Sequence, residues 1–327
     1  MSGLPARLAE LGDPLRYRLP TMRRVTWYPL GCPLSIETNS DEVLEAAGSV
    51  WGHYPAAALP LSARLIVDVS TEHVETAQSL PVTLGQEHLI SIVDSAANFA
   101  VADLNRGFAA ARLSANAILD RRFLLDGFLE PLAYLMLGAR HFVMVHAACV
   151  VLHGRAILLC GDSGAGKTCL AYACARLGWS FLSGDAAQIV RGSTPLEVVG
   201  RPYTIRFRES AQRLFPELAA LPASIRGAKI DVEAGAARLG LRPVLRATVE
   251  RLIFLNRVAG ADGAEIAGFD RDLALALLDR TVFYGDERVR LEQRRTLREL
   301  VKLPVARLTY SDPGAAERRL REVVGSR

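Results

Sequence analysis

The strongest chemical pattern in this chain is G-x-x-x-x-G-K-T, carried by Gly161-Asp162-Ser163-Gly164-Ala165-Gly166-Lys167-Thr168. This pattern is typical of a phosphate-binding loop, the P-loop, because its glycines let backbone N–H groups turn inward around a phosphate. We expect Lys167 to reach the β- and γ-phosphates of a nucleotide and the Thr168 hydroxyl to hold Mg²⁺. The sequence therefore predicts that residues 161–168 bind ATP together with Mg²⁺.

The residues on either side of this loop supply the flanks that a P-loop needs. The apolar run 156–160 predicts a strand that enters the loop, and 167–177 predict a helix that leaves it and ends before Gly178. Such a helix points its free N–H groups and the positive end of its dipole at a bound phosphate. Only three of the 39 basic residues are lysines, so a lysine at position 167 favours a functional loop over a chance match.

A carboxylate follows at the end of the next predicted strand. The segment 179–182 predicts a short strand ending at Ser183-Gly184-Asp185, and Asp185 lies 18 residues after Lys167. One strand and one helix after a P-loop, a carboxylate can face the phosphates and the metal, so Asp185 is a candidate metal ligand and catalytic residue. The alternative is that Asp185 only forms a turn. A second, more distant carboxylate, usual in P-loop ATPases, is missing because the predicted strand 251–256 ends in Asn256.

Three further basic residues are candidates for neutralising phosphate charge. Arg206 and Arg208 fall on one face of a predicted strand over 203–208, and Lys229 begins another predicted strand over 229–232. In a chain this rich in arginine, the favoured alternative for each of them is an ordinary surface residue.

Length and composition limit the class of protein. The chain has 327 residues, half of them hydrophobic, and a net charge of +4, which indicates a globular protein of two domains or one large one. Basic and acidic residues alternate over 287–298, so we expect a solvated helix there rather than a nucleic-acid surface. The five cysteines form no C-x-x-C pair and favour reduced, buried thiols over a zinc site. We expect a cytoplasmic protein with no nucleic-acid or membrane partner, and self-association stays open.

The chain divides into two predicted parts. Residues 1–139 show a mixed α+β pattern without a catalytic signature, including strands over 63–69 and 89–93 and helices over 41–51 and 119–137. Residues 140–327 form the P-loop domain. There we predict one strand over 142–152, a turn at His153-Gly154, and an antiparallel return strand into the loop, unlike the parallel neighbours of common GTPases.

At this point the sequence resembles a known family. The residues that carry the resemblance are Val145-His146, His153-Gly154, the run from Leu158 to Thr168, Phe181-Leu182-Ser183-Gly184-Asp185, and Leu308-Thr309-Tyr310-Ser311-Asp312-Pro313. Over roughly 140–327 they resemble the catalytic domain of the HPr kinase/phosphorylase family. The resemblance implies an α/β P-loop kinase domain of the HPr kinase and phosphoenolpyruvate carboxykinase type, here preceded by a smaller α+β domain. It also implies binding of ATP or pyrophosphate with Mg²⁺ and transfer of phosphate to a serine hydroxyl.

The resemblance also implies roles for individual residues. It places His146 near the phosphates, although a buried core histidine is an equal alternative. It makes Asp185 the metal-side member of an Asp-Asp pair, with Thr168 as the second metal ligand, and leaves Asp185, His146 and Lys167 as the catalytic set. The chain departs from the family at Gly184, where the pair's first carboxylate, the expected general base, is absent. We therefore expect a kinase acting on a protein serine or a small hydroxylated metabolite, with a nucleotide-binding regulatory module as the alternative and an ordinary ATPase as a weaker third.

Overall fold

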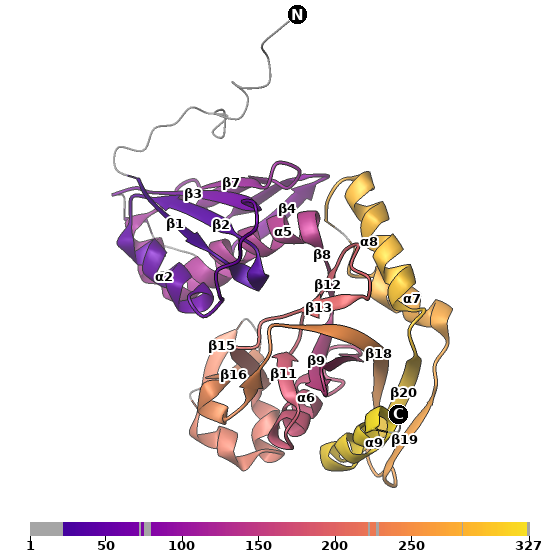
Figure 1. Ribbon diagram of the computed structural model, residues 1–327. Coiled ribbons are helices and arrows are strands. Elements are labelled where there is room, and N and C mark those ends of the chain that lie inside the picture. Colours follow the sequence, from indigo (N-terminus) through magenta and orange to yellow (C-terminus); the bar gives the residue numbers. More distant parts are fainter. Residues whose placement is uncertain are drawn as a thin grey trace, which may run out of the picture. The chain divides into compact units, whose positions relative to one another are not determined.

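The computed structural model describes residues 22–71, 73–74, 80–221, 223–226, 229–282 and 284–325. The chain forms two compact units (Figure 1): unit 1 holds the residues up to Arg140 together with Tyr284–Glu287, and unit 2 holds His141–Phe283 and Arg288–Arg327. Both units are mixed α/β, and the main sheet of each contains parallel and antiparallel strand pairs. Within the described residues, no helix is both long and apolar enough to cross a membrane.

Unit 1 is built on a sheet of seven strands in the order β1-β2-β3-β7-β6-β5-β4. Its strands are β1 (Arg23–Trp27), β2 (Leu34–Thr38), β3 (Ala63–Val69), β4 (Val82–Gln86), β5 (Leu89–Val93), β6 (Phe99–Asp103) and β7 (Phe108–Leu113). The predicted strands 63–69 and 89–93 are confirmed, whereas β2 and β4 were not predicted. Alternate residues of the central strands, such as Leu65 and Val67 on β3, are fully buried and form the core of this unit.

Helices cover the buried face of this sheet. The predicted helix over 41–51 is confirmed as α2 (Asp41–Trp51), which begins where the Ser40 side chain accepts a hydrogen bond from the Val43 N–H. The single helix predicted over 119–137 is wrong. The chain forms α3 (Ala115–Leu119), α4 (Arg121–Leu124), the π-helical turn η2 (Leu125–Leu129) and α5 (Glu130–His141). The break falls at Asp120, whose extended backbone and side chain cap a new helix.

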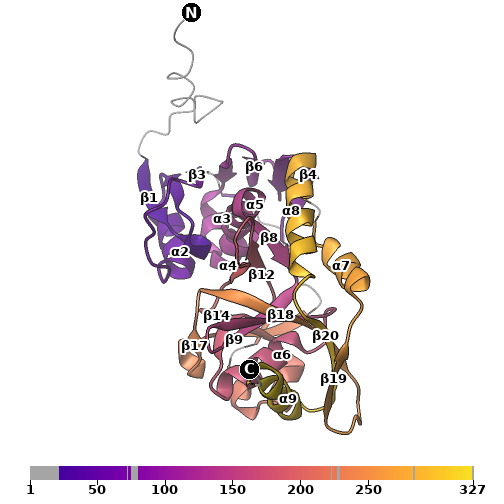
Figure 2. The ribbon, with the colours of Figure 1, turned by 45° about the vertical axis from the view of Figure 1, so that its right-hand side comes forward.

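Unit 2 contains the predicted P-loop segment and a sheet of ten strands. Its strands are β8 (Phe142–Val145), β9 (Ala147–Leu152), β10 (Arg155–Cys160), β11 (Ser180–Ser183), β12 (Ala187–Val190), β13 (Glu197–Val199), β17 (Arg242–Pro243), β18 (Arg246–Arg257), β19 (Ala264–Gly268) and β20 (Val305–Tyr310). β10 lies at the centre, antiparallel to β9 on one side and parallel to β18 on the other. β20 extends the sheet beyond β18, and Figure 2 shows β18, β20 and β19 as neighbours.

Both faces of this sheet are buried. Side chains alternate along β10, so that Ile157 and Leu159 pack under α6 (Lys167–Arg176) and α9 (Pro313–Gly325), whereas Ala156, Leu158 and Cys160 face the cluster of α7 (Arg271–Asp279) and α8 (Glu287–Leu300). Because β10 is buried on both faces, it reads in the sequence as a continuous apolar run.

A small three-stranded sheet packs beside α6. It has the order β14-β16-β15, from β14 (Thr204–Arg208), β15 (Ala223–Arg226) and β16 (Lys229–Gly235). Ile205 and Phe207 of β14 point into the α6 core, which leaves Arg206 and Arg208 on the opposite face of the strand, as predicted. Short 3-10 turns complete the unit at η3 (Glu209–Arg213), η4 (Pro216–Ala220) and η5 (Ala237–Leu239), and a further one, η1 (Pro29–Gly31), lies in unit 1.

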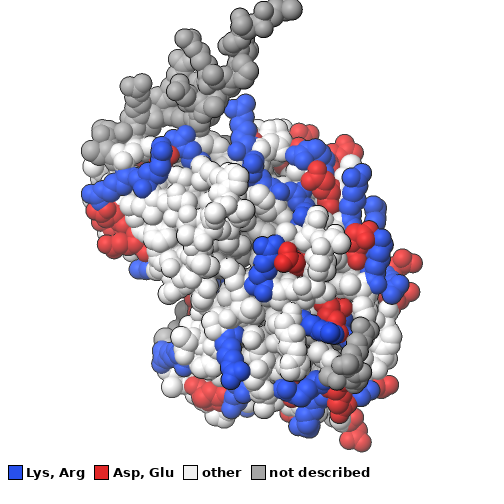
Figure 3. Space-filling view, in the orientation of Figure 1, with Lys and Arg blue, Asp and Glu red and all other residues white. Residues whose placement is uncertain are grey.

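The arginine-rich segment predicted as a solvated helix is α8. Arg288 Nη1 lies 2.9 Å from Glu292 Oε1, and Arg294 Nε lies 2.9 Å from Asp279 Oδ1. On the molecular face in Figure 3, Lys and Arg side chains are likewise interspersed with Asp and Glu side chains. These ion pairs place a carboxylate beside each of the two arginines, so the positive charge of α8 is partly neutralised.

Candidate functional site: the loop between β10 and α6

The hairpin formed by β9 and β10 carries the loop. Its turn is made by His153 and Gly154, which both have positive φ angles (50° and 78°), as a tight two-residue hairpin turn requires. The antiparallel register pairs Cys160, the last residue of β10, with Ala147, the first residue of β9. The predicted hairpin is therefore confirmed, and it brings His146 to the start of the loop.

The loop itself depends on glycine. Gly161, Gly164 and Gly166 have φ angles of 150°, 92° and 91°, which residues with a Cβ rarely adopt. α6 begins at Lys167, directly after Gly166, and its first intrahelical hydrogen bond runs from the Leu170 N–H to the Gly166 carbonyl. The N–H groups of 167–169 are thus the free donors at the start of this helix, where an anion is favoured.

The Lys167 ammonium group lies inside this loop and is held by three acceptors. Its Nζ lies 2.8 Å from the Gly161 carbonyl oxygen, 2.9 Å from the Asp162 carbonyl oxygen and 3.0 Å from His146 Nε2. Lys167 is only 5% exposed. Burial lowers the pKa of Lys167, and the nearby carboxylates of Asp185 and Asp162 partly offset this effect.

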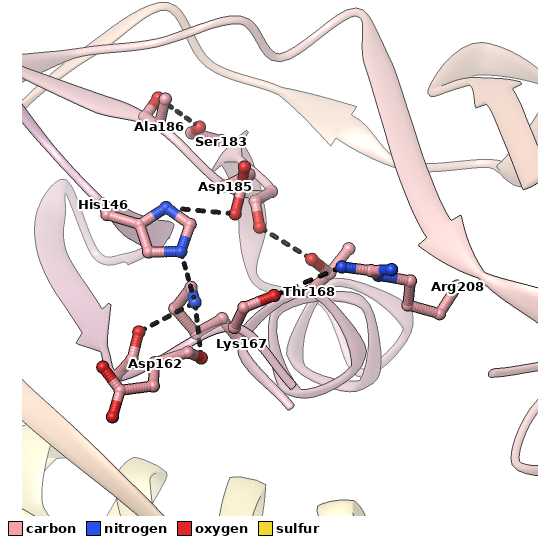
Figure 4. Close-up of polar contacts among 11 residues, drawn as sticks. His146, Asp162, Lys167, Thr168, Ser183, Asp185, Ala186 and Arg208 are labelled. Atoms are coloured by element: carbon pink, nitrogen blue, oxygen red, sulfur yellow. Dashed lines mark hydrogen bonds and ion pairs between the residues drawn. The ribbon is translucent and has the colours of Figure 1, made fainter. Parts of the chain in front are cut away.

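His146 joins Lys167 to Asp185. Its Nδ1 lies 3.4 Å from Asp185 Oδ1, and Figure 4 shows the imidazole between the two side chains. A protonated lysine can only donate, so His146 Nε2 accepts from Lys167 and its proton resides on Nδ1, facing the carboxylate. The His146 side chain is 42% exposed and that of Asp185 is 69% exposed, so His146 is not the buried core histidine that the sequence left open.

Two strand breaks create this contact. The prediction of one strand over 142–152 is wrong, because the segment forms two strands, β8 and β9, which are interrupted at His146. β8 pairs with β12 and β9 pairs with β11, both antiparallel, and Gly184-Asp185-Ala186 form the break between β11 and β12. The two interruptions lie opposite each other. His146 and Asp185 therefore both lie outside the strand pairing at the same place in the sheet.

Thr168 and Gly184 meet on the same side of the loop. The Thr168 hydroxyl donates to the Gly184 carbonyl oxygen at 2.8 Å. Thr168 therefore contacts the residue that directly precedes Asp185 in the chain. The hydroxyl and carboxylate are hard oxygen donors, the type that Mg²⁺ prefers, and Mg²⁺ commonly takes only one or two protein ligands besides water and phosphate. Among the described residues, no group of three or more His, Cys, Asp and Glu side chains could hold a metal. The donor set therefore fits Mg²⁺ and not a closed structural metal site.

The predicted basic residues separate in the structure. Arg208 lies beside the loop (Figure 4). Its Nη2 donates to Ser163 Oγ at 3.2 Å, and its Nε lies 3.9 Å from Asp231 Oδ1. Arg206 instead pairs with Glu233 of β16. The side chain of Lys229 lies outside the described residues. Of the two predicted arginines, Arg206 and Arg208, only Arg208 contacts the loop in the described structure.

Two residues at this loop were not predicted from the sequence. The Tyr310 hydroxyl, at the end of β20, donates to the Ala165 carbonyl oxygen at 3.2 Å. A Cβ on Gly166 would lie 2.7 Å from this hydroxyl and 3.8 Å from Cδ of Arg257. Both residues end strands on the β18 side of β10, and this strand order could not be predicted from the sequence. Asn256 stands near the end of the strand on which P-loop ATPases usually carry a second carboxylate. Its Nδ2 donates to Thr309 Oγ1 at 3.2 Å.

Comparisons with known proteins add little to this geometry. No family model and no curated protein matches the chain. Among solved structures, the chain is similar to the Hpr(Ser) kinase/phosphatase from Coxiella burnetii, with 13% sequence identity and a TM-score of 0.30, over 56% of this chain and 97% of that chain. An identity and a TM-score this low do not establish a shared fold or activity.

Proposed function

We propose that this chain is an ATP- and Mg²⁺-dependent kinase of the HPr kinase/phosphorylase type, which transfers phosphate to a hydroxyl acceptor on a protein serine or a small metabolite. The observation that carries this proposal is the linked set of Lys167, His146 and Asp185 at the loop. A cation, an imidazole and a carboxylate at one end of a phosphate-binding loop are the groups that phosphoryl transfer to a hydroxyl needs.

Each residue then has a distinct task. The N–H groups of 161–168 and the Lys167 ammonium bind the β- and γ-phosphates and neutralise their charge. Thr168 and Asp185 would hold Mg²⁺, which supplies further charge neutralisation when bound. In the reaction the acceptor oxygen bonds to the γ-phosphorus, the bond from that phosphorus to the β–γ bridging oxygen breaks, and ADP leaves.

The acceptor hydroxyl must also lose its proton. In the structure both ring nitrogens of His146 are engaged, one as acceptor from Lys167 and one facing Asp185. Asp185 is the more exposed of the two side chains. We therefore assign proton acceptance to Asp185 and the orientation of this carboxylate to His146. Because phosphoryl transfer depends mainly on positioning and charge, a base at position 184 is not indispensable.

The direct test is phosphate transfer. Purified protein with γ-labelled ATP, Mg²⁺ and a cytosolic extract should label an acceptor, and Lys167→Met protein should not. Release of labelled inorganic phosphate at the same rate with and without extract would instead identify an ordinary ATPase. That alternative has little structural support, since β18, the parallel neighbour of β10, ends in Asn256 and Arg257 and not in a carboxylate.

A second candidate function follows from Gly184. Without a carboxylate at this position, the chain would be a nucleotide-binding regulatory module with little or no transfer. This function predicts that the protein binds ATP and Mg²⁺ but labels no acceptor in the same experiment.

A further inference from the structure

The P-loop has two flanks that the sheet makes chemically different. β9 and β11 lie on one side of β10 and lead into His146 and Asp185, whereas β18 and β20 lie on the other side and end in Arg257 and Tyr310. The groups proposed for transfer are therefore on the β9 flank. Among the described residues, the β18 flank carries the cation Arg257 at its tip and none of the groups to which we assign metal binding or proton transfer.

β18 is long enough to run alongside the loop. Its residue Phe254 is paired with Cys160, the end of β10, so that 255–257 continue past the strand and beside the loop. A Cβ on Gly161 would lie 3.7 Å from the Leu255 Cβ, which shows how closely this extension follows the loop. Arg257, two residues further on, then reaches the opposite end of the loop at Gly166 and the start of α6.

Tyr310 fixes this flank to the loop. It is the register partner of Arg257 on β20, and its hydroxyl donates to the Ala165 carbonyl oxygen. Tyr310 is 1% exposed, and burial raises its pKa to about 12, so the hydroxyl stays protonated as a donor. The backbone of Arg257 is therefore fixed next to the loop through its strand partner Tyr310 on β20.

The charge of Arg257 is not used within the described part of the chain. Its side chain is exposed, and its guanidinium forms no hydrogen bond or ion pair with another residue that the structure describes. Arg206 pairs with Glu233, and Arg208 contacts Ser163 near Asp231, so both differ from Arg257 in this respect. An arginine without a carboxylate partner beside an anion-binding helix start is suited to bind a phosphate.

We propose that Arg257 binds the α-phosphate of a nucleoside triphosphate and so makes the loop prefer a nucleotide over inorganic pyrophosphate. This inference rests on the proposed function, in which the γ-phosphate lies by Lys167 and Asp185 on the β9 flank. The phosphate chain then crosses the loop, and its non-transferred end lies at the start of α6. Pyrophosphate fills only the β- and γ-positions, so it has no group that reaches Arg257.

The test compares three ligands on one variant. ATP, ADP and pyrophosphate are titrated calorimetrically, each with Mg²⁺, into wild type, Arg257→Gln and the control Arg307→Gln, which removes an exposed arginine from neighbouring β20. We expect Arg257→Gln to weaken ATP and ADP about tenfold and pyrophosphate less than twofold, because the guanidinium bonds only the α-phosphate. Arg307→Gln should bind all three ligands like wild type.

Other outcomes overturn the inference in recognisable ways. Equal weakening of pyrophosphate and ATP would mean that Arg257 acts on the shared phosphates, and unchanged ATP affinity would mean that it binds no phosphate. Both results leave ATP binding by the wild type, and with it the proposed function, intact. A wild type that binds neither ATP nor pyrophosphate would instead overturn the proposed function itself. Because Arg257 is exposed, its variant should fold, and a thermal melt checks this.

Discussion

The Nζ atom of Lys167 lies 3.0 Å from Nε2 of His146, and the other nitrogen of the same imidazole faces Asp185. The loop lysine is therefore held in position by the protein before any phosphate is bound. In the proposed function, a phosphate entering the loop would compete with His146 and two carbonyl oxygens for the ammonium hydrogens. Because these hydrogen bonds keep the side chain ordered, little conformational entropy is lost when the phosphate replaces them.

We predict that Lys167→Met lowers ATP affinity by about a hundredfold or more, because the variant loses a charge-assisted contact to two phosphates. Calorimetric titration with ATP and Mg²⁺ measures the change. Lys302→Met is the matched control, since the side chain of this lysine is 67% exposed and pairs with Glu299 on the surface. Equal affinities of the two variants would contradict the assignment of residues 161–168 as a nucleotide site.

Thr168→Ala and Asp185→Asn should each raise the Mg²⁺ concentration needed for half-maximal nucleotide turnover, by about tenfold. The reason is the loss of one hard oxygen ligand from the proposed metal set. A Mg²⁺ titration at saturating ATP measures this requirement. Asp262→Asn, which removes an exposed carboxylate between β18 and β19, should leave it unchanged. If both site variants keep the wild-type requirement, these residues do not hold the metal.

Gly184→Asp should increase transfer to the acceptor. A Cβ at this position would lie 3.5 Å from Thr168 Cγ2 and 3.6 Å from Ile205 Cγ1, which are ordinary contact distances. The new carboxylate would stand beside Asp185 and supply a base for the acceptor hydroxyl. Initial rates with labelled ATP measure the effect, and Gly184→Asn controls for size. An increase from the amide variant equal to that from the acid would exclude proton transfer as the cause.

Local sequence signals predict local parts of the fold. The Ser40 cap with the apolar period after it predicts α2, and the His153-Gly154 turn between apolar runs predicts the β9–β10 hairpin. The break at His146 could not be predicted, because it depends on pairing with β11 and β12, which lie more than thirty residues further along the chain. A continuous apolar run looks the same whether it forms one strand or two.

The same limit applies to the site. The loop and Asp185 are recognisable from spacing alone, since strand, loop, helix and strand follow one another in the chain. Arg257 and Tyr310 reach the loop only because β18 and β20 lie next to β10, and strand order is a property of the tertiary fold. Arg206 and Arg208 share a strand face, and only the position of Glu233 and Ser163 separates their roles.

Glu317→Ala should lower the free energy of unfolding by about 3 kcal/mol, because it leaves buried polar groups without a partner. Oε1 of this carboxylate accepts from Trp179 Nε1 at 2.7 Å and from Arg321 Nε at 2.8 Å, and Trp179 is fully buried. Urea unfolding measures the loss. Glu317→Gln keeps an acceptor for the indole, so it should lose clearly less. Equal losses in the two variants would show that the charge, and not the bond to Trp179, stabilises α9.

The affinity for ATP should begin to fall at a lower pH than it would if Lys167 had the ordinary pKa of a lysine. Burial lowers the pKa of Lys167 below the usual lysine value of 10.5, and phosphate binds the protonated form. As the pH rises through this lowered pKa, the free protein loses the proton that ATP binding requires, and affinity approaches a tenfold loss per pH unit. Titrations of ATP between neutral pH and 10.5 test this dependence.

Stability should change in the opposite direction over the same range. The unfolded chain binds the Lys167 proton more tightly than the folded chain, so the ionised lysine destabilises the fold at neutral pH, and this cost is relieved as the pH rises toward 10.5. The melting temperature of Lys167→Met relative to wild type should therefore decrease with rising pH, since the variant has no such cost to relieve. Other titrating groups are common to both proteins and cancel in this difference. A difference in melting temperature that stays constant with pH would show that burial does not lower the pKa of this lysine.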